Sequence, residues 1–330
     1  MLIVLILLHH IDTRFDSNIN EISGCLFERI TEYDGNGGVI SISSCITDLQ
    51  ICESTFKNCS VNTNTSFGGA IFFDSGHFEL YCVVGVSCTS NQGHFCFLRC
   101  QHGCYVDYAS IAGSSNEKEG LYSIICSGGY VKMKKSNSSK NYAREASSFA
   151  IINPISFYGS FNTISLCHSI ISTVLLKIQK AKFWNSNMIN CSSSIKGVIS
   201  LVKGELSLLS IFIENNTKTL FYVENGLIII SGCTIQHTET LMMGSIAMQN
   251  LNPKNVSKFI LNHYQNEFLK MEHPIENQIA PIALTEPATA TKKSSSLLII
   301  LIAVGAFILF IVLALYVWHK KPSNVNQVTT

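Results

Sequence analysis

The sequence predicts an all-β fold in which parallel strands stack into a solenoid, followed by one membrane-spanning helix near the C-terminus. Three observations predict it. Short β-rich runs alternate with Gly, Asn and Ser turns, segments repeat at a period near 22 residues, and Leu297 to Trp318 contains no charge, amide side chain or proline. The predicted segments follow in chain order.

The N-terminus, residues 1–18, is expected to be a short signal peptide or its remnant. Leu2 to Leu8 is an uninterrupted apolar run, as in the core of a secretory signal, although no Lys or Arg precedes it and no small-x-small cleavage site follows. A tail-anchored protein whose domain stays in the cytosol is the competing interpretation.

Residues 19–245 are expected to form the solenoid, and their second half repeats most clearly. The segment GVISLVKGELSLLSIFIENN, from Gly197, aligns without a gap with TLFYVENGLIIISGCTIQHT, from Thr219. Apolar and glycine positions then coincide: Val198 with Leu220, Leu201 with Val223, Gly204 with Gly226, Leu206 with Ile228, and Ile213 with Ile235. Ile189, 24 residues before Ile213, extends the series. A period of this size is one supersecondary unit per repeat, and β-branched runs between small turns favour parallel strands over leucine-rich repeats.

The first half repeats more loosely, at about 30 residues. Gly37-Gly38-Val39-Ile40 recurs as Gly68-Gly69-Ala70-Ile71, and a cysteine-containing strand follows each copy, from Cys52 and from Cys82. One glycine of each pair can take positive φ, and neither adds a Cβ to a crowded corner. We therefore expect Gly37, Gly38, Gly68 and Gly69 to form the turns between rungs.

These segments resemble the polymorphic outer membrane proteins and related protist surface proteins, which carry repeated GGAI and FxxN elements. GGAI is Gly68 to Ile71, with a variant at Gly37 to Ile40, and FxxN is Phe212 to Asn215, with Phe56-Lys57-Asn58-Cys59 close to it. The resemblance implies a right-handed parallel β-helix of the pectin-lyase-like class. Bacterial members end in a membrane β-barrel, whereas this chain is expected to end in a helix, as the protist single-pass form would.

The C-terminal segments are expected to be a cap at residues 246–279, a Pro/Thr/Ser stalk at 280–296, the transmembrane helix at 297–318 and a cytoplasmic tail at 319–330. As a helix the apolar run rises about 33 Å, which exceeds a hydrocarbon core of about 30 Å. Lysines flank both ends of the run, so charge leaves its orientation open. The short apolar start and the resemblance favour a plasma-membrane protein with an extracellular N-terminal domain.

Thirteen cysteines are present, and ten precede residue 127. Disulfides of a secreted domain and buried thiols that pack as small apolar groups are both open interpretations. The candidates for either role are Cys52, Cys59, Cys82, Cys88, Cys96, Cys100 and Cys104. His94 and His102 lie among the last three, but a C-x₂-C knuckle is lacking, so we expect no metal site. Candidate N-glycosylation sites are Asn58, Asn64, Asn137, Asn190, Asn215 and Asn255.

The expected function is non-enzymatic: a membrane-anchored surface protein whose β-helix presents loops to a glycan or protein ligand. Net charge is +1, which gives no support for nucleic-acid binding, and the basic run KMKKS, Lys132 to Ser136, is expected to be a solvated turn. All six Asp lie at or before Asp107, and neither an Asp pair nor Asp-x-Asp occurs. Catalytic residues and cofactors are therefore not expected. The alternatives are a membrane-tethered polysaccharide lyase or hydrolase and a tail-anchored cytosolic scaffold.

Overall fold

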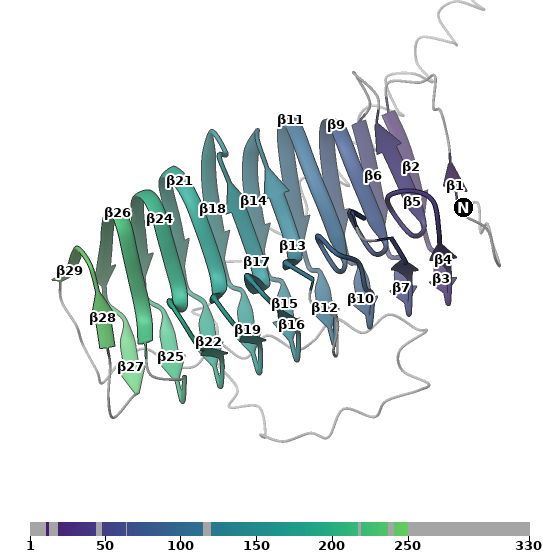
Figure 1. Ribbon diagram of the computed structural model, residues 1–330. Helices are drawn as coiled ribbons and strands as arrows, with labels where there is room; N and C mark the ends of the chain where they lie inside the picture. The colour runs from purple at the N-terminus through teal and green to yellow at the C-terminus, as the bar shows by residue number, and fades with distance from the viewer. Residues whose placement is uncertain are drawn as a thin grey trace, which may run out of the picture. The chain divides into compact units, whose positions relative to one another are not determined.

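The computed structural model describes residues 11–12, 19–43, 48–63, 65–114, 120–216, 219–236 and 241–249. These residues form an all-β solenoid of about eight turns, in which each strand pairs in parallel with the equivalent strand of the next turn (Figure 1). The predicted parallel solenoid is thus confirmed. No helix in the described part of the chain is long and apolar enough to span a membrane, and Leu297 to Trp318 lies outside that part.

One face of the solenoid is a sheet of nine strands, each three residues long. Successive strands begin 22 to 29 residues apart, so the rungs shorten toward the C-terminal end. They are β3 (Leu26–Glu28), β7 (Thr55–Lys57), β10 (Val84–Val86), β12 (Ser110–Ala112), β15 (Asn137–Ser139), β19 (Thr163–Ser165), β22 (Asn187–Ile189), β25 (Phe212–Glu214) and β27 (Thr234–Gln236).

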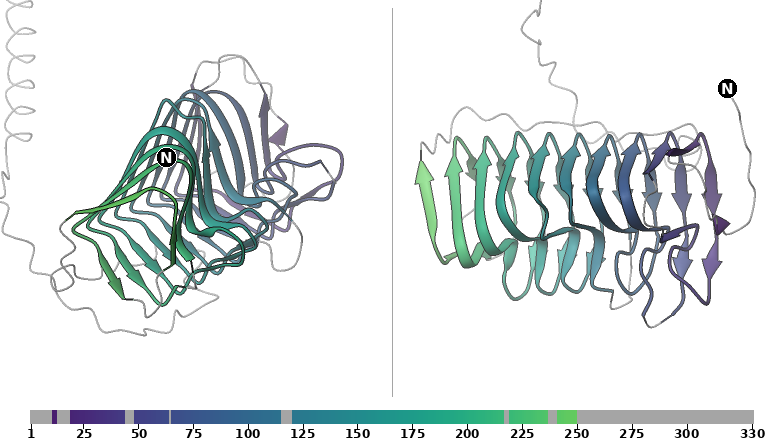
Figure 2. Two further views of the ribbon diagram at one scale, coloured as in Figure 1. Left: turned by 60° about the vertical axis from the view of Figure 1, so that its left-hand side comes forward. Right: turned by 90° about the horizontal axis from the view of Figure 1, so that it is seen from above.

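A larger sheet of fifteen strands bends around the rest of the core (Figure 2). At the bend the long strands carry a register shift, as between Cys100 and Gly103, and other rungs break into two strands. Its strands are β1 (Ile11–Asp12), β2 (Ile19–Ser23), β5 (Ile40–Ser43), β6 (Asp48–Cys52), β9 (Ile71–Tyr81), β11 (Cys96–Asp107), β13 (Tyr122–Ser127), β14 (Tyr130–Lys134), β17 (Ala146–Ile152), β18 (Ser156–Ser160), β21 (Ser172–Trp184), β24 (Gly197–Leu209), β26 (Thr219–Ser231), β28 (Leu241–Met243) and β29 (Ile246–Gln249).

Five two-residue strands form small ladders at a corner. They are β4 (Thr31–Glu32) with β8 (Ser60–Val61), and β16 (Tyr142–Ala143), β20 (His168–Ser169) and β23 (Ser192–Ser193).

Alternate residues of the strands in the two large sheets, from β3 to β27, point into a continuous apolar core. Phenylalanines stack there along the solenoid: the Phe27 and Phe56 ring centroids are 4.9 Å apart, and those of Phe157 and Phe183 are 6.4 Å apart. A second apolar cluster, which includes Phe72, lies on the outward side of the larger sheet before its bend. The core is therefore filled with side chains, and the polar chemistry lies at the corners and on the outside.

Left-handed backbone brackets the three-residue strands on both sides. The residue two before each of these nine strands, and the residue after each of the first eight, have φ between 46° and 64°. The first series is Gly24, Glu53, Cys82, Tyr108, Lys135, Phe161, Asn185, Ser210 and Gly232, and the second is Arg29, Asn58, Ser87, Gly113, Lys140, Leu166, Asn190 and Asn215. This conformation costs about 1–2 kcal/mol for a residue with a Cβ. Stacking compensates, because each corner N–H donates to a carbonyl of the next turn, as from Tyr108 to Lys134.

The 22-residue offset is confirmed at the level of register: Leu201 pairs with Val223, Gly204 with Gly226, Leu206 with Ile228, and Ile213 with Ile235. The extension to Ile189 is wrong by one residue. Met188 is the partner of Ile213, because the turn from β22 to β25 takes 25 residues.

The ends of the described solenoid differ slightly from the predicted boundaries. Strand β29 pairs with β26 as far as Gln249, four residues beyond the predicted end at 245. Strand β1 lies inside the segment expected as a signal sequence and pairs with β5.

Candidate functional site

The paired glycines lie where backbone atoms of the same turn and of the next turn come very close. Gly37 and Gly68 have φ of +67° and +66°, and a Cβ on them would lie 1.9 and 2.0 Å from the carbonyl oxygens of Ile40 and Ile71. A Cβ on Gly38 or Gly69 would come within 2.2 Å of a carbonyl oxygen of the next turn. These four residues therefore shape the rung turns and offer no chemical group to a ligand.

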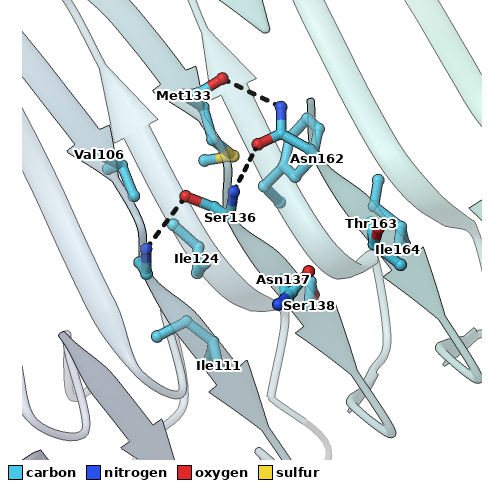
Figure 3. A pocket seen from close by; sticks show the side chains of 12 residues that line it. Val106, Ile111, Ile124, Met133, Ser136, Asn137, Ser138, Asn162, Thr163 and Ile164 are labelled. Carbon is cyan, nitrogen blue, oxygen red and sulfur yellow. Dashed lines mark hydrogen bonds between the residues drawn. The ribbon is translucent and has the colours of Figure 1, made fainter. Parts of the chain in front are cut away.

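Three buried asparagines satisfy backbone groups that the corners leave without a strand partner. The Asn162 Oδ1 accepts from the Ser136 N–H at 3.1 Å, and its Nδ2 donates to the Met133 carbonyl at 3.0 Å (Figure 3). Asn141 and Asn216 make the same pair of contacts with the preceding turn. Asn141 accepts from the Ser114 N–H and donates to the Ile111 carbonyl. Asn216 accepts from the Cys191 N–H and donates to the Met188 carbonyl. An unpaired buried backbone group costs about 1–3 kcal/mol, so these amides hold consecutive turns together.

Cysteines occupy the same corner positions and make the matching contact. Each thiol lies near two carbonyls. One is the carbonyl that an asparagine amide would reach: Phe27 for Cys59, Phe56 for Cys88, Ser138 for Cys167, Ile164 for Cys191 and Leu208 for Cys233. The other belongs to the residue two before the cysteine, at 3.4 to 3.6 Å. All twelve cysteines in the described residues are free thiols, and ten are buried. The structure thus favours the packing interpretation of these thiols, and it adds a polar role for the thiol hydrogen.

The two FxxN-like segments, from Phe56 and from Phe212, are offset by one residue along the ladder. Phe56 aligns along the ladder with Ile213, so the counterpart of Cys59 is Asn216. Asn215 is instead the left-handed corner residue. A motif defined by Phe alone selected the wrong start, because Phe212 and Ile213 are neighbouring apolar residues.

The cysteine and histidine side chains of HFCFLRCQHGC, residues 94–104, do not form one common site. Cys96, Cys100 and Cys104 face inward, whereas His102 is exposed at the bend. The Cys104 Sγ lies 3.5 Å from the Cys126 Sγ of the following turn, and burial raises the pKa of the Cys96 thiol. The described residues contain no group of three or more His, Cys, Asp or Glu side chains placed to hold a metal ion.

His94 is buried on the turn before β11. Its Nδ1 accepts from the Ser90 N–H at 3.2 Å, and a Cβ on Gly120 would touch the ring at 1.9 Å from Cε1. Burial lowers the pKa of His94 to about 4, so the ring is neutral at neutral pH. Cys52 and Cys82 are half-buried and do not occupy equivalent positions: Cys52 pairs with Tyr81, and Cys82 is the next corner residue.

The candidate sequons differ in accessibility. Asn58, Asn190 and Asn215 are exposed left-handed corner residues, whereas Asn137 is buried in β15. Asn64 and Asn255 lie outside the described residues. We expect a glycan on Asn137 to interfere with the pairing of β15.

The interior offers little space for a ligand. A cavity of about 10 Å³ lies among Val106, Met133, Asn162 and their neighbours (Figure 3). A second cavity of the same volume lies among Phe149, Phe183 and other apolar side chains. Each is close to the volume that one water molecule requires. Neither of these two cavities would admit a ligand larger than water.

Strands β11, β14, β18 and β21 belong to successive rungs of the larger sheet (Figure 1). After the bend, lysines and aromatic residues alternate along these strands with buried residues and so lie on the outward side. In-register pairing places Tyr105 beside Lys132, Lys132 beside Tyr158, and Tyr158 beside Lys182. We call the following group the lysine–aromatic face: Tyr105, Tyr130, Lys132, Lys134, Lys135, Tyr158, Lys182 and Trp184.

Close contacts order this face. The Lys132 Nζ lies 5.0 Å from the Tyr105 ring centroid, and the Tyr158 and Trp184 centroids are 6.2 Å apart, edge to face. Lys135 donates to the Tyr108 hydroxyl, which raises the pKa of that lysine. Strands β14, β18 and β21 contain no Asp or Glu, so the lysines form a positive band on a chain whose net charge is only +1.

Sequence analysis missed this face and treated KMKKS as a solvated turn. The signal was present but needed the rung lengths: Tyr105, Lys132, Tyr158 and Lys182 are separated by 27, 26 and 24 residues, which are the local periods. No protein-family model matches the chain, and no curated protein matches it.

Proposed function

We propose that the chain is a non-enzymatic surface protein that uses the outside of its solenoid to recognise a ligand. The observation that carries the proposal is the lysine–aromatic face, an exposed array of cations and rings on a rigid support whose interior is filled. Solenoids present extended faces that suit extended ligands.

The proposal includes a membrane anchor and an orientation. Leu297 to Trp318 would cross the plasma membrane, with the solenoid outside and the short tail in the cytoplasm. We also propose a right-handed coil related to the polymorphic outer membrane proteins. The support is the pair of GGAI-like elements, whose glycines occupy the same crowded corner on successive turns.

Labelling of intact cells tests the proposal. A membrane-impermeant amine reagent is applied to cells that express the full chain, with and without permeabilisation, and the modified lysines are mapped by mass spectrometry. We expect Lys132 and Lys182, both exposed, to be modified on intact cells. Modification of these residues only after permeabilisation would contradict a surface location and favour the cytosolic scaffold.

A further inference from the structure

The centre of the lysine–aromatic face alternates ring and cation along the solenoid axis. Tyr158 lies between Lys132 and Lys182 on the two neighbouring rungs. Adjacent strands are about 4.8 Å apart, so the backbones of Lys132 and Lys182 are about 10 Å apart along the axis. The spacing is imposed by backbone hydrogen bonds and does not depend on a mobile loop.

The ring between the cations is available to a ligand. Tyr158 is 38% exposed and makes a T-shaped contact with Trp184, and Tyr130 on the neighbouring strand is 51% exposed. Tyr105 differs, because Lys132 lies over its ring and the His77 centroid is 4.7 Å away. An exposed ring flanked by cations offers an apolar surface to a molecule whose charged groups lie on either side.

The positive charge of this face is partly offset at one border, where Asp107 attracts Lys134 and Lys135. Among the described residues, Lys132, Lys134 and Lys182 form no ion pair with a carboxylate. Asp107 pairs in register with Lys134 at one border of the face, and burial raises the pKa of its carboxyl group. The ligand that complements this band is therefore an anion extended along the solenoid axis.

We propose that the lysine–aromatic face binds an extended acidic glycan that carries one anionic group in each disaccharide. The anions would meet Lys132 and Lys182, and the C–H face of the sugar between them would lie on Tyr158. Double-stranded DNA or an anionic membrane would need only the charge, whereas the alternation of ring and cation matches alternating sugar and acid. This inference rests on the proposed recognition function and names its ligand class.

Binding by the full-length chain in neutral detergent tests the inference. The probe is a hyaluronan octasaccharide, which has one carboxylate per disaccharide, and a dextran octasaccharide is the neutral control. Double-stranded DNA and anionic phospholipid vesicles are the comparison ligands. The variants are the double substitution Lys132→Gln with Lys182→Gln, the single substitution Tyr158→Ser, and the control Lys140→Gln with Lys203→Gln. The control removes the same charge from exposed positions outside the face.

We expect the acidic octasaccharide to bind, and the double variant to weaken its affinity by about tenfold. Tyr158→Ser should weaken the affinity for the glycan but not for DNA, and the control variant should stay within about twofold. Equal affinity in the double variant and its control would overturn the inference. Tyr158→Ser without effect, together with DNA or vesicles bound as tightly as the glycan, would do the same.

The two proposals fail separately. Lack of glycan binding by a chain whose lysines are modified on intact cells removes the acidic-glycan ligand and leaves the surface function in place. Modification only after permeabilisation removes the surface function, whatever the purified chain binds.

Discussion

At the scale of single residues, the corners of the solenoid use two side chains for one task. Asn216 reaches the carbonyl of Met188 through its amide, and Cys191 reaches that of Ile164 through its thiol. Both residues are buried at equivalent points of successive turns. The abundance of cysteine therefore reflects a recurrent need for a small buried donor, which explains how so many cysteines remain thiols.

The equivalence of the two residues is testable by exchange. Cys191→Asn should keep the free energy of unfolding within about 1 kcal/mol, because an amide can donate to the same carbonyl. Cys191→Val fills similar volume but removes the thiol donor, and should be less stable than Cys191→Asn by about 1 kcal/mol. Urea denaturation of the two variants and the parent chain measures the difference. Equal stability of the Asn and Val variants would show that the thiol contributes packing alone.

His94 makes stability depend on pH. Its pKa is lowered by burial to about 4 in the folded chain, against about 6.5 when unfolded, so the unfolded state binds the proton first. The contribution is complete above about pH 6.5 and is lost as pH falls toward about 4, with a total near 3 kcal/mol. His94→Asn, which keeps an acceptor for the Ser90 N–H, should reduce this slope. Parallel stability-against-pH curves for parent and variant would show that His94 is not the group responsible.

At the scale of elements, the repeating unit is a three-residue strand with a left-handed corner residue on each side. This unit explains which predictions succeeded. The 22-residue offset was visible because Gly204 and Gly226 lie at the same bend and the core residues on both sides of them pair in register. The predicted alignment of Ile189 with Ile213 was wrong because one extra residue in a turn does not change the residue pattern that reveals the repeat. Left-handed corners at Lys135 and Phe161 could not be predicted, since neither residue type favours positive φ.

The glycine turns can be tested with a matched pair. Gly68 and Gly24 have φ of +66° and +64°, but a Cβ on Gly68 would meet the Ile71 carbonyl oxygen at 2.0 Å, whereas a Cβ on Gly24 meets nothing within 4 Å. Gly24→Ala should cost about 1 kcal/mol from the backbone conformation alone. Gly68→Ala should cost about 3 kcal/mol or more, because backbone must move. Similar losses in thermal unfolding would mean that φ alone determines the cost.

At the scale of the whole molecule, the described solenoid is built from turns that contact only their neighbours. The fold class was predictable from the repeat, but the lysine–aromatic face was not, because its residues come from separate rungs of unequal length. A surface of this kind is created by the stacking and has no local motif. The rung lengths therefore determine both the stacking of the strands and which side chains meet on the lysine–aromatic face.

Removal of one whole turn should preserve the architecture. Deletion of residues 187–211 joins the residue before β22 to the start of β25, so every inward position keeps its phase. Deletion of residues 187–198 removes about half a turn and places core residues outside. We expect the first variant to resist limited proteolysis and to keep a β-rich circular dichroism spectrum, and the second to lose both. Equal behaviour of the two deletions would contradict independent turns.

Cross-linking on intact cells tests the central claim most directly, namely that a parallel solenoid presents the lysine–aromatic face outside the cell. Lys132 and Lys182 are distant in sequence but two rungs apart in space, about 10 Å along the axis. A membrane-impermeant amine cross-linker should join them on intact cells, and mass spectrometry should recover the linked peptides. Absence of this link both before and after permeabilisation would contradict the solenoid register, and a link that forms only after permeabilisation would contradict the surface location.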